Sequence, residues 1–186
     1  MNKNDRRVRK TKKALQEALA KLLAEKDLRQ ITIRELTETA DIHRATFYAH
    51  YQDVYDLYEQ LEKSILSELN DIIDDGIINS YKVVYKAVID YVYDHAEVMK
   101  MFFSTKSNNT LRNSICELIE KKYLNIWLFQ SNRTEISDEM RYLTTYNIQG
   151  CIAIIILWIN SGFSYPKEKV AELIQKVNDN VEQIMD

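Results

Sequence analysis

The fold of this chain is decided by residues 32–51, TIRELTETADIHRATFYAHY. Thr32 and Glu35 form a capping box, because a hydroxyl and a carboxylate three residues apart can each accept from a backbone N–H at the start of a helix. Asp41 then interrupts the helix, since aspartate adopts the left-handed conformation of a tight turn more readily than most residues. The pattern predicts a short helix that begins at Thr32 and ends in a turn at Asp41.

Two further helices are predicted around this one. A third helix over residues 43–51 places Phe47 and Tyr51 one turn apart, so that both can face inward. A first helix over residues 11–25 carries apolar side chains at amphipathic spacing, namely Leu15, Ala18, Leu19, Leu22 and Leu23. Two short helices joined by a tight turn make a helix-turn-helix.

The outward side chains of the third helix suit a DNA groove. They are Arg44, Ala45, Thr46, Tyr48 and His50. Arginine can bridge O6 and N7 of guanine, and alanine and threonine can meet the thymine methyl group, while Tyr48 and His50 can donate to phosphate oxygens. The alternative is that Tyr48 and His50 are ordinary half-buried side chains, since short amphipathic helix pairs occur in many folds.

Residues 11–57, and above all 32–36 and 40–51, resemble the DNA-binding head of transcriptional regulators of the TetR/AcrR type. The resemblance implies that bases are approached by Arg34, Arg44, Ala45 and Thr46. It implies that phosphates are contacted by Thr32, Tyr48 and His50. With that family we expect a ligand-responsive repressor that binds a palindromic operator in double-stranded DNA as a homodimer.

Four positions depart from the family pattern. The family usually has glycine at the positions of Asp27 and Asp41, a capping serine or threonine at that of His43, and often a lysine at that of Val54. Aspartate adopts the left-handed conformation at modest cost, so both turns are expected to survive. His43 and Val54 leave fewer phosphate contacts, and they keep an alternative open: a TetR-like interaction module that acts through a protein partner without binding DNA.

The net charge of −3 conceals an asymmetry between the two ends of the chain. Residues 1–52 hold twelve Lys and Arg against seven Asp and Glu, and the remaining residues hold thirteen against twenty-one. The cations at the start predict a basic arm that reaches along the DNA backbone or into the adjacent minor groove, where narrow A·T tracts attract cations. A solvated tail is the alternative. The residues expected to contact DNA from this arm are Arg6, Arg7, Arg9 and Lys10.

Longer helices are predicted beyond residue 52, because the apolar spacing is helical and three glycines and one proline leave little material for hairpins. Their ranges are 53–74, 80–95, 97–103, 110–130, 137–161 and 166–185. We therefore expect an all-α chain of about nine helices. Residues 1–68 are expected to form the DNA-binding domain with its arm and linker helix, and residues 69–186 the effector-sensing and dimerisation domain.

The last two helices are expected to form the homodimer interface. Residues 146–159 are apolar nearly all round, and Gly150 permits close approach of two backbones. The last helix carries one apolar stripe, made of Val170, Leu173, Ile174, Val177, Val181 and Ile184. Two such helices from each subunit can close a four-helix bundle, which is the arrangement that the resemblance implies. The alternative is that both helices fill the core of a monomer.

An unknown small-molecule effector is expected to bind the C-terminal domain. Ligand sites are mostly apolar with a few polar groups. The aromatic residues that could line such a cavity are Tyr91, Phe102, Phe103, Tyr123, Trp127, Tyr142 and Tyr146. The alternative is that they are core residues, as aromatic side chains at helical spacing usually are.

Catalysis, cofactors and metal binding find no support in the sequence. Of the three histidines, His43 and His50 would lie about 10 Å apart along a helix, too far to share one metal ion. No phosphate-binding loop or nucleophile motif is present, and Cys116 and Cys151 are expected to be core residues. The chain has no apolar signal segment, and its longest apolar run, residues 151–159, is shorter than a spanning helix of roughly 20 residues. We expect a cytoplasmic regulator that is neither an enzyme nor a membrane protein.

Overall fold

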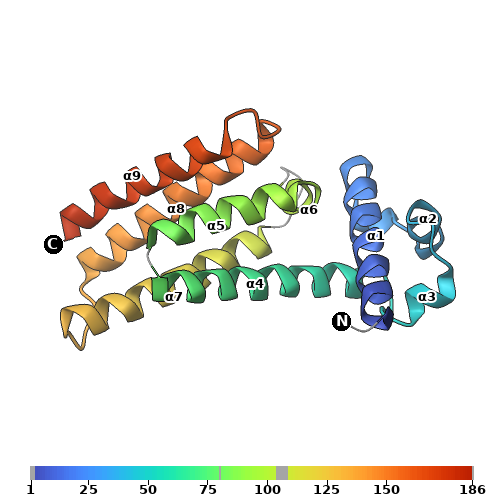
Figure 1. Cartoon of the computed structure of the whole chain (residues 1–186), viewed down its shortest axis with the longest axis horizontal. Coiled ribbons are helices and arrows are strands. Elements are labelled where there is room, and N and C mark those ends of the chain that lie inside the picture. The colour runs from blue at the N-terminus through green and yellow to red at the C-terminus, as the bar shows by residue number, and fades with distance from the viewer. Residues whose placement is uncertain (1–2, 80, 104–108, 186) are drawn as a thin grey trace. The chain divides into compact units, whose positions relative to one another are not determined.

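The computed structural model describes residues 3–79, 81–103 and 109–185, and its secondary structure within these ranges is helical (Figure 1). The described elements are α1 (Lys3–Glu25), η1 (Leu28–Gln30), α2 (Ile33–Thr39), α3 (Arg44–Tyr48), α4 (Val54–Asn79), α5 (Tyr81–Asp94), α6 (Ala96–Phe102), α7 (Thr110–Ser131), α8 (Asp138–Asn160) and α9 (Lys167–Met185). The expected all-α fold is confirmed.

The chain divides into two compact units, and both include residues of α4. The first unit comprises residues up to Ile65 together with Glu97–Phe102, and the second comprises Leu66–Ala96 together with residues from Phe103 onward. The changeover within α4 lies close to the boundary expected at residue 68. The sequence did not indicate that most of α6 belongs to the first unit. There the buried ring of Phe102 packs against Tyr58, with the ring centroids 4.9 Å apart.

Helix α1 begins well before residue 11, where the sequence pattern placed its start. It runs from Lys3 to Glu25, so the basic residues expected in a separate arm occupy its first turns. The segment expected to form the arm is helical because it contains no glycine or proline, and lysine and arginine are good helix formers. The inward stripe is the predicted one, with Leu15, Leu19 and Leu22 buried.

The start of α2 and the turn after it have the predicted conformation. Thr32 is the N-cap of α2, and its Oγ1 accepts the backbone N–H of Glu35 at 3.2 Å. The carboxylate of Glu35 pairs with the ammonium of Lys26 instead of completing the capping box. Asp41 has a left-handed φ of 53°, whereas Asp27 is extended and caps η1. Of the two aspartates that stand where the family usually has glycine, only Asp41 therefore adopts the left-handed backbone that favours glycine.

Helix α3 is shorter than predicted. It ends at Tyr48, although hydrogen bonds of 2.9 Å from the backbone N–H groups of His50 and Tyr51 to the carbonyl of Phe47 continue the turn. The inward pair is as predicted, since Phe47 and Tyr51 are both buried and their ring centroids lie 5.7 Å apart. This pair fixes which face of α3 remains outside.

Helix α4 starts at the predicted cap and ends later than predicted. Asp53 Oδ1 accepts the N–H of Asp56 at 2.8 Å, and Asp56 Oδ2 accepts the N–H of Gln52 at 2.8 Å. The bond from Gln52, followed by one from Gln60, lowers the pKa of Asp56. The helix continues through Gly76 to Asn79, because one glycine costs only about 1 kcal/mol of helix propensity and does not by itself stop a helix.

The second unit is a packed set of long helices. Helix α9 packs against α5 and α8, and α8 packs against α7 (Figure 1). Ser137 caps α8, since its Oγ accepts the N–H of Met140 at 3.2 Å. Gly162, with φ of 71°, lies in the turn between α8 and α9. The bounds of these helices agree closely with the predicted ranges.

We expect Asp41→Ala to lower the free energy of unfolding by about 1 kcal/mol, because a left-handed backbone brings Cβ close to the following carbonyl and alanine lacks the oxygens that help aspartate. Asp41→Gly is the matched control and should be at least as stable as the wild type, since glycine adopts positive φ without steric cost. Urea unfolding followed by circular dichroism measures both. Equal losses in the two variants would contradict this account of the turn.

Candidate functional site

The helix-turn-helix surface is the outward face of α2 and α3. Arg44, Ala45 and Tyr48 are exposed on α3, Tyr48 to 59%, while Thr46 and His50 are half-buried. The ring of Tyr48 stands edge-on to the buried ring of Phe47 at 5.6 Å. The contact with Phe47 therefore limits the movement of the Tyr48 ring and of the hydroxyl that it carries.

Arg34 lies on the first turn of α2 and is also exposed. Its Nε donates to Oε1 of Glu38 at 2.8 Å, one turn further along the helix. This hydrogen bond raises the pKa of Arg34 above its ordinary value, so the group stays charged. The bond uses Nε alone, so the terminal nitrogens of the guanidinium keep their N–H groups for another acceptor.

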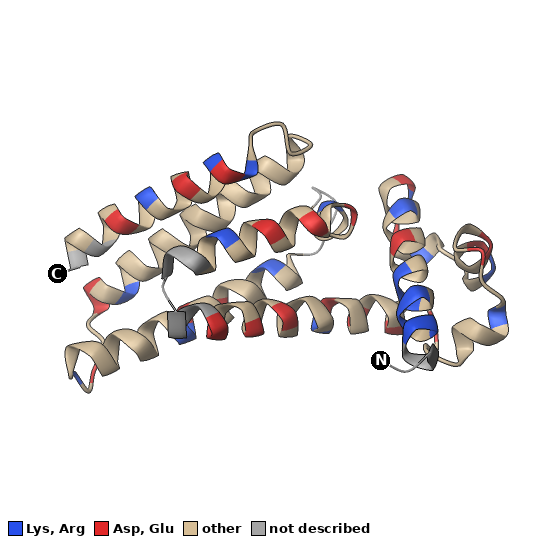
Figure 2. Cartoon of the chain, viewed as in Figure 1, with Lys and Arg blue, Asp and Glu red and all other residues tan. Residues whose placement is uncertain are grey.

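The basic residues of α1 form a second surface of the first unit. Arg6, Arg7, Arg9 and Lys10 are all exposed, and Lys and Arg follow one another along this helix (Figure 2). Arg9 and Lys10 lie three and four positions after Arg6, so each shares a helix face with Arg6. The predicted cations are thus presented by a rigid helix.

Two departures from the family pattern have different structural consequences. Val54 is buried at the first position of α4, so this position carries a core side chain in place of a phosphate ligand. His43 is the N-cap of α3, but its side chain makes no capping hydrogen bond with the described residues. The start of α3 is held by the backbone, where the carbonyl of His43 accepts from Thr46 and Phe47.

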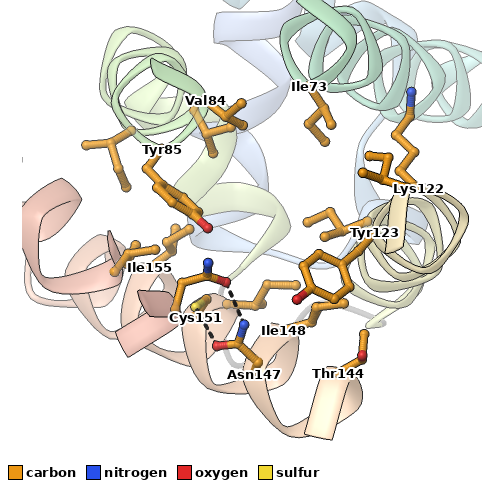
Figure 3. Close-up of a pocket in the computed structure, with 17 residues that line it drawn as sticks. Ile73, Val84, Tyr85, Lys122, Tyr123, Thr144, Asn147, Ile148, Cys151 and Ile155 are labelled. Carbon is orange, nitrogen blue, oxygen red and sulfur yellow. Dashed lines mark hydrogen bonds between the residues drawn. The ribbon is translucent and has the colours of Figure 1, made fainter. Parts of the chain in front are cut away.

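The second unit contains a cavity of about 140 Å³ between helices of its own. Its wall is mainly isoleucine and valine, and it comes from α4, α5, α7, α8 and α9. Figure 3 shows the hydroxyl ends of Tyr85 and Tyr123 pointing into the cavity. The cavity is therefore apolar with a few neutral polar groups, as small-molecule sites usually are.

Two of these polar groups bind each other. Asn147 Nδ2 donates to Asn178 Oδ1 at 2.6 Å, and both residues are buried. Cys151 contributes a weak contact from its Sγ to Asn147 Oδ1 at 3.8 Å. Burial raises the pKa of Cys151 to about 11, so its thiol remains protonated near neutral pH.

Thr144 and Lys122 complete the polar lining. Thr144 is only 1% exposed, and its Oγ1 has no hydrogen-bond partner among the described residues. Leaving such a group buried without a partner costs about 1–3 kcal/mol. The ammonium of Lys122 points away from the cavity (Figure 3) and pairs with Asp74, so only its apolar stem lines the wall.

The structure does not bring the seven predicted aromatic residues together in this cavity. Tyr123 lines it, but the other six do not. Tyr91 is buried beside His95, Phe102 belongs to the first unit, and Trp127 lies under the guanidinium of Arg133 at 5.2 Å. The remaining three are the half-buried Phe103 and the exposed Tyr142 and Tyr146.

The cavity residues that were missed had a signal in the sequence. Thr144, Asn147 and Cys151 follow one face of an otherwise apolar helix at spacings of three and four. Asn178 interrupts the inward positions of α9, where Val170, Ile174 and Val181 are buried. Polar side chains at core positions would have located the cavity better than the aromatic residues did.

Helices α8 and α9 expose apolar side chains. These are Tyr142, Tyr146, Leu157, Leu173 and Ile184. By length and composition α8 could also cross a membrane, and 33% of its most apolar window is buried inside the chain. A core helix of a regulator passes the same test, so the feature to be explained is the apolar face that is left uncovered.

The first unit carries a helix-turn-helix with polar side chains on its outward face, and the second unit contains a cavity between its helices. This combination is typical of helix-turn-helix regulators. Residues 79–180 match the TetR family model described as the transcriptional regulator C-terminal region. The chain is 43% identical over 171 residues to the uncharacterized HTH-type transcriptional regulator YxbF of Bacillus subtilis (strain 168), covering 86% of this chain and 42% of that protein. The chain therefore belongs to the TetR family of transcriptional regulators.

Two solved structures show the same fold at low sequence identity. The dihydroxyacetone kinase operon activator DhaS has a TM-score of 0.63 and 19% identity, over 93% of this chain and 94% of that one. FadR from Bacillus subtilis in complex with stearoyl-CoA has a TM-score of 0.63 and 18% identity, over 90% of this chain and 96% of that one. At these identities the likeness shows the fold alone.

We expect Asn147→Leu to lower the free energy of unfolding by about 1–3 kcal/mol, because it leaves the carbonyl of Asn178 without this donor in the core. The double variant Asn147→Leu/Asn178→Leu should recover part of the loss, since both amides of the pair are removed together. Urea unfolding of the wild type, both single variants and the double variant completes the cycle. Additive losses would show that the two amides are not coupled.

Proposed function

We propose that this TetR family member is a ligand-responsive repressor that binds a palindromic operator as a homodimer in the cytoplasm. The observation that carries the proposal is the outward face of α3, held over the buried Phe47 and Tyr51. The relatives are named as transcriptional regulators, which does not support the alternative of an interaction module without DNA binding. DhaS is named an activator, so the sign of regulation is part of the test.

We assign base contacts to four side chains in the first turns of α2 and α3. These are Arg34, Arg44, Ala45 and Thr46. Phosphate contacts are assigned to Thr32, Tyr48 and His50, and to Arg6, Arg7, Arg9 and Lys10 of α1. Arginine forks onto guanine, whereas a tyrosine hydroxyl on phosphate fixes register without reading sequence.

Arg34→Ala should cost about 1–3 kcal/mol on the operator and little on random DNA, because a base contact is lost. Tyr48→Phe should weaken both duplexes together, since it removes only a hydroxyl from the phosphate backbone. The operator is first selected from fragmented genomic DNA, and fluorescence anisotropy then measures both affinities at fixed salt.

Arg29→Ala is the matched control, because Arg29 is an exposed arginine of η1 outside the helix-turn-helix surface. It should leave the ratio of operator to random affinity unchanged. An Arg34→Ala protein with the wild-type ratio would remove Arg34 from the base-reading set.

The proposed dimer interface is the exposed face of α8 and α9. On α8, Tyr146, Gly150, Ala153 and Leu157 follow one another at spacings of three and four, and a Cβ added at Gly150 would meet nothing within 4 Å. This face can therefore admit a closely approaching helix. The single stripe expected on α9 is divided, because Val170, Ile174 and Val181 are buried while Leu173 and Ile184 are exposed. One half packs inside the chain, and we assign the other half to the partner.

Leu157→Glu should convert the dimer to a monomer at micromolar protein concentration, because it places a charge in the apolar centre of the proposed interface. Leu157 is 72% exposed, so the fold of the monomer should not suffer. Phe129→Glu on α7, at a site 89% exposed, is the control and should remain dimeric. Multi-angle light scattering measures both masses, and a monomeric wild type would refute the interface.

The effector site that we propose is the cavity of the second unit. Ile73 of α4 lines this cavity, and the same helix starts at its Asp53 cap in the first unit. An effector that favours one position of α4 would therefore change which arrangements of the head are populated. Affinity for the operator would fall as the cavity fills, and transcription from a reporter decides between repression and activation.

A further inference from the structure

The cavity of the second unit contains one polar group that the fold itself does not satisfy. Thr144 lies on α8 and is 1% exposed, yet its Oγ1 has no partner among the described residues. A threonine in a helix commonly donates to the carbonyl four residues before it, as Thr37 does to Ile33 at 2.8 Å in this chain. Thr144 makes no such bond with the described residues. Its Oγ1 is closed off in the empty cavity, so a ligand bonds to it after the side chain turns about χ1, for which threonine has two rotamers in a helix.

The rest of the lining offers no uncompensated charge. Among the lining residues that the structure describes, Lys122 is the one that is charged. Its ammonium is directed away from the cavity and is paired with Asp74 (Figure 3). The amides of Asn147 and Asn178 are bonded to each other. A charged ligand would have to be buried without a counter-ion or would have to break an existing ion pair, and both are costly.

The size of the cavity limits the ligand further. Its volume is about 140 Å³, whereas pockets for drug-sized molecules span about 300–1,000 Å³. An apolar protein cavity of about 150 Å³ accommodates benzene. The volume therefore matches a single six-membered ring or a short aliphatic chain.

We propose that the effector is a small uncharged molecule with an apolar body of about one ring and a single hydroxyl or carbonyl that bonds to Thr144 Oγ1. The proposal rests on the cavity being the effector site of the proposed function, and it names the ligand class of that site. It separates this chain from the FadR structure, which holds stearoyl-CoA, although the two share a fold. Isoleucine and valine side chains surround the body of the ligand, and Thr144 selects its polar group.

Phenol and toluene are the matched probes, because they differ by one hydroxyl in place of a methyl group. Isothermal titration calorimetry on the full chain should show phenol binding about three- to tenfold more tightly than toluene, the range of one neutral hydrogen bond. Thr144→Val should bring this ratio to about one, while Thr144→Ser should keep it. Both variants retain the shape of the site closely enough to fold, and Thr144→Val should unfold at a higher urea concentration because a buried hydroxyl without a partner is removed.

Benzoate and stearoyl-CoA test the charge and size limits, and neither should bind measurably under conditions where phenol saturates. Tighter binding of benzoate or stearoyl-CoA than of phenol, no binding of phenol, or a phenol preference that survives in Thr144→Val would each overturn the proposal. Operator binding is measured separately without probe. If the wild-type protein binds its operator but not phenol, the proposed ligand class is wrong and the proposed function stands. If it binds phenol but no operator, the proposed function is wrong and the ligand class stands.

Discussion

The packing of Phe47 is the constraint on which the helix-turn-helix surface depends. Helix α3 has 5 residues, and an isolated helix shorter than about 12–15 residues is marginal in water. It exists because Phe47 is fully buried and Tyr51 packs beside it. Once these two side chains are placed inside, the helical period directs Arg44, Ala45 and Tyr48 outward. The DNA contacts that we propose for this face therefore depend on an apolar contact inside the head.

The sequence predicted helix ends correctly where a residue has one specific local role, such as an N-cap or a left-handed turn. Thr32 predicted the start of α2, Asp41 predicted a left-handed turn, and both are found. The weaker predictions concerned helix ends without a decisive residue. Nothing in residues 3–10 stops a helix, so the basic segment continues α1, and Gly76 alone did not end α4. A boundary follows from sequence only where a cap or a left-handed residue makes continuation costly.

The cavity could not be predicted from aromatic residues, because their size makes them useful in several roles. In this chain Phe102 packs in the first unit, Tyr91 lies against the ring of His95, and Tyr142 and Tyr146 remain exposed on α8. The residues that mark the cavity are the polar ones for which a core position is expensive. Thr144, Asn147 and Asn178 interrupt apolar faces, and two of them offset this cost by bonding to each other. Thr144 has no partner among the described residues to offset the cost of burying its hydroxyl, and this is the basis for proposing a ligand there.

Helix α8 is apolar on nearly every side because two opposite faces have different roles. At about 100° per residue, Thr144, Ile148 and Cys151 point toward the cavity, while Tyr146, Ala153 and Leu157 lie on the opposite, exposed face. One helix thus carries the wall of the proposed effector site on one side and the proposed dimer contact on the other. A rigid helix cannot shift one face without moving the other. Filling the cavity would therefore alter the surface presented to the second subunit, and it would do so through α8 itself, in addition to any movement of α4.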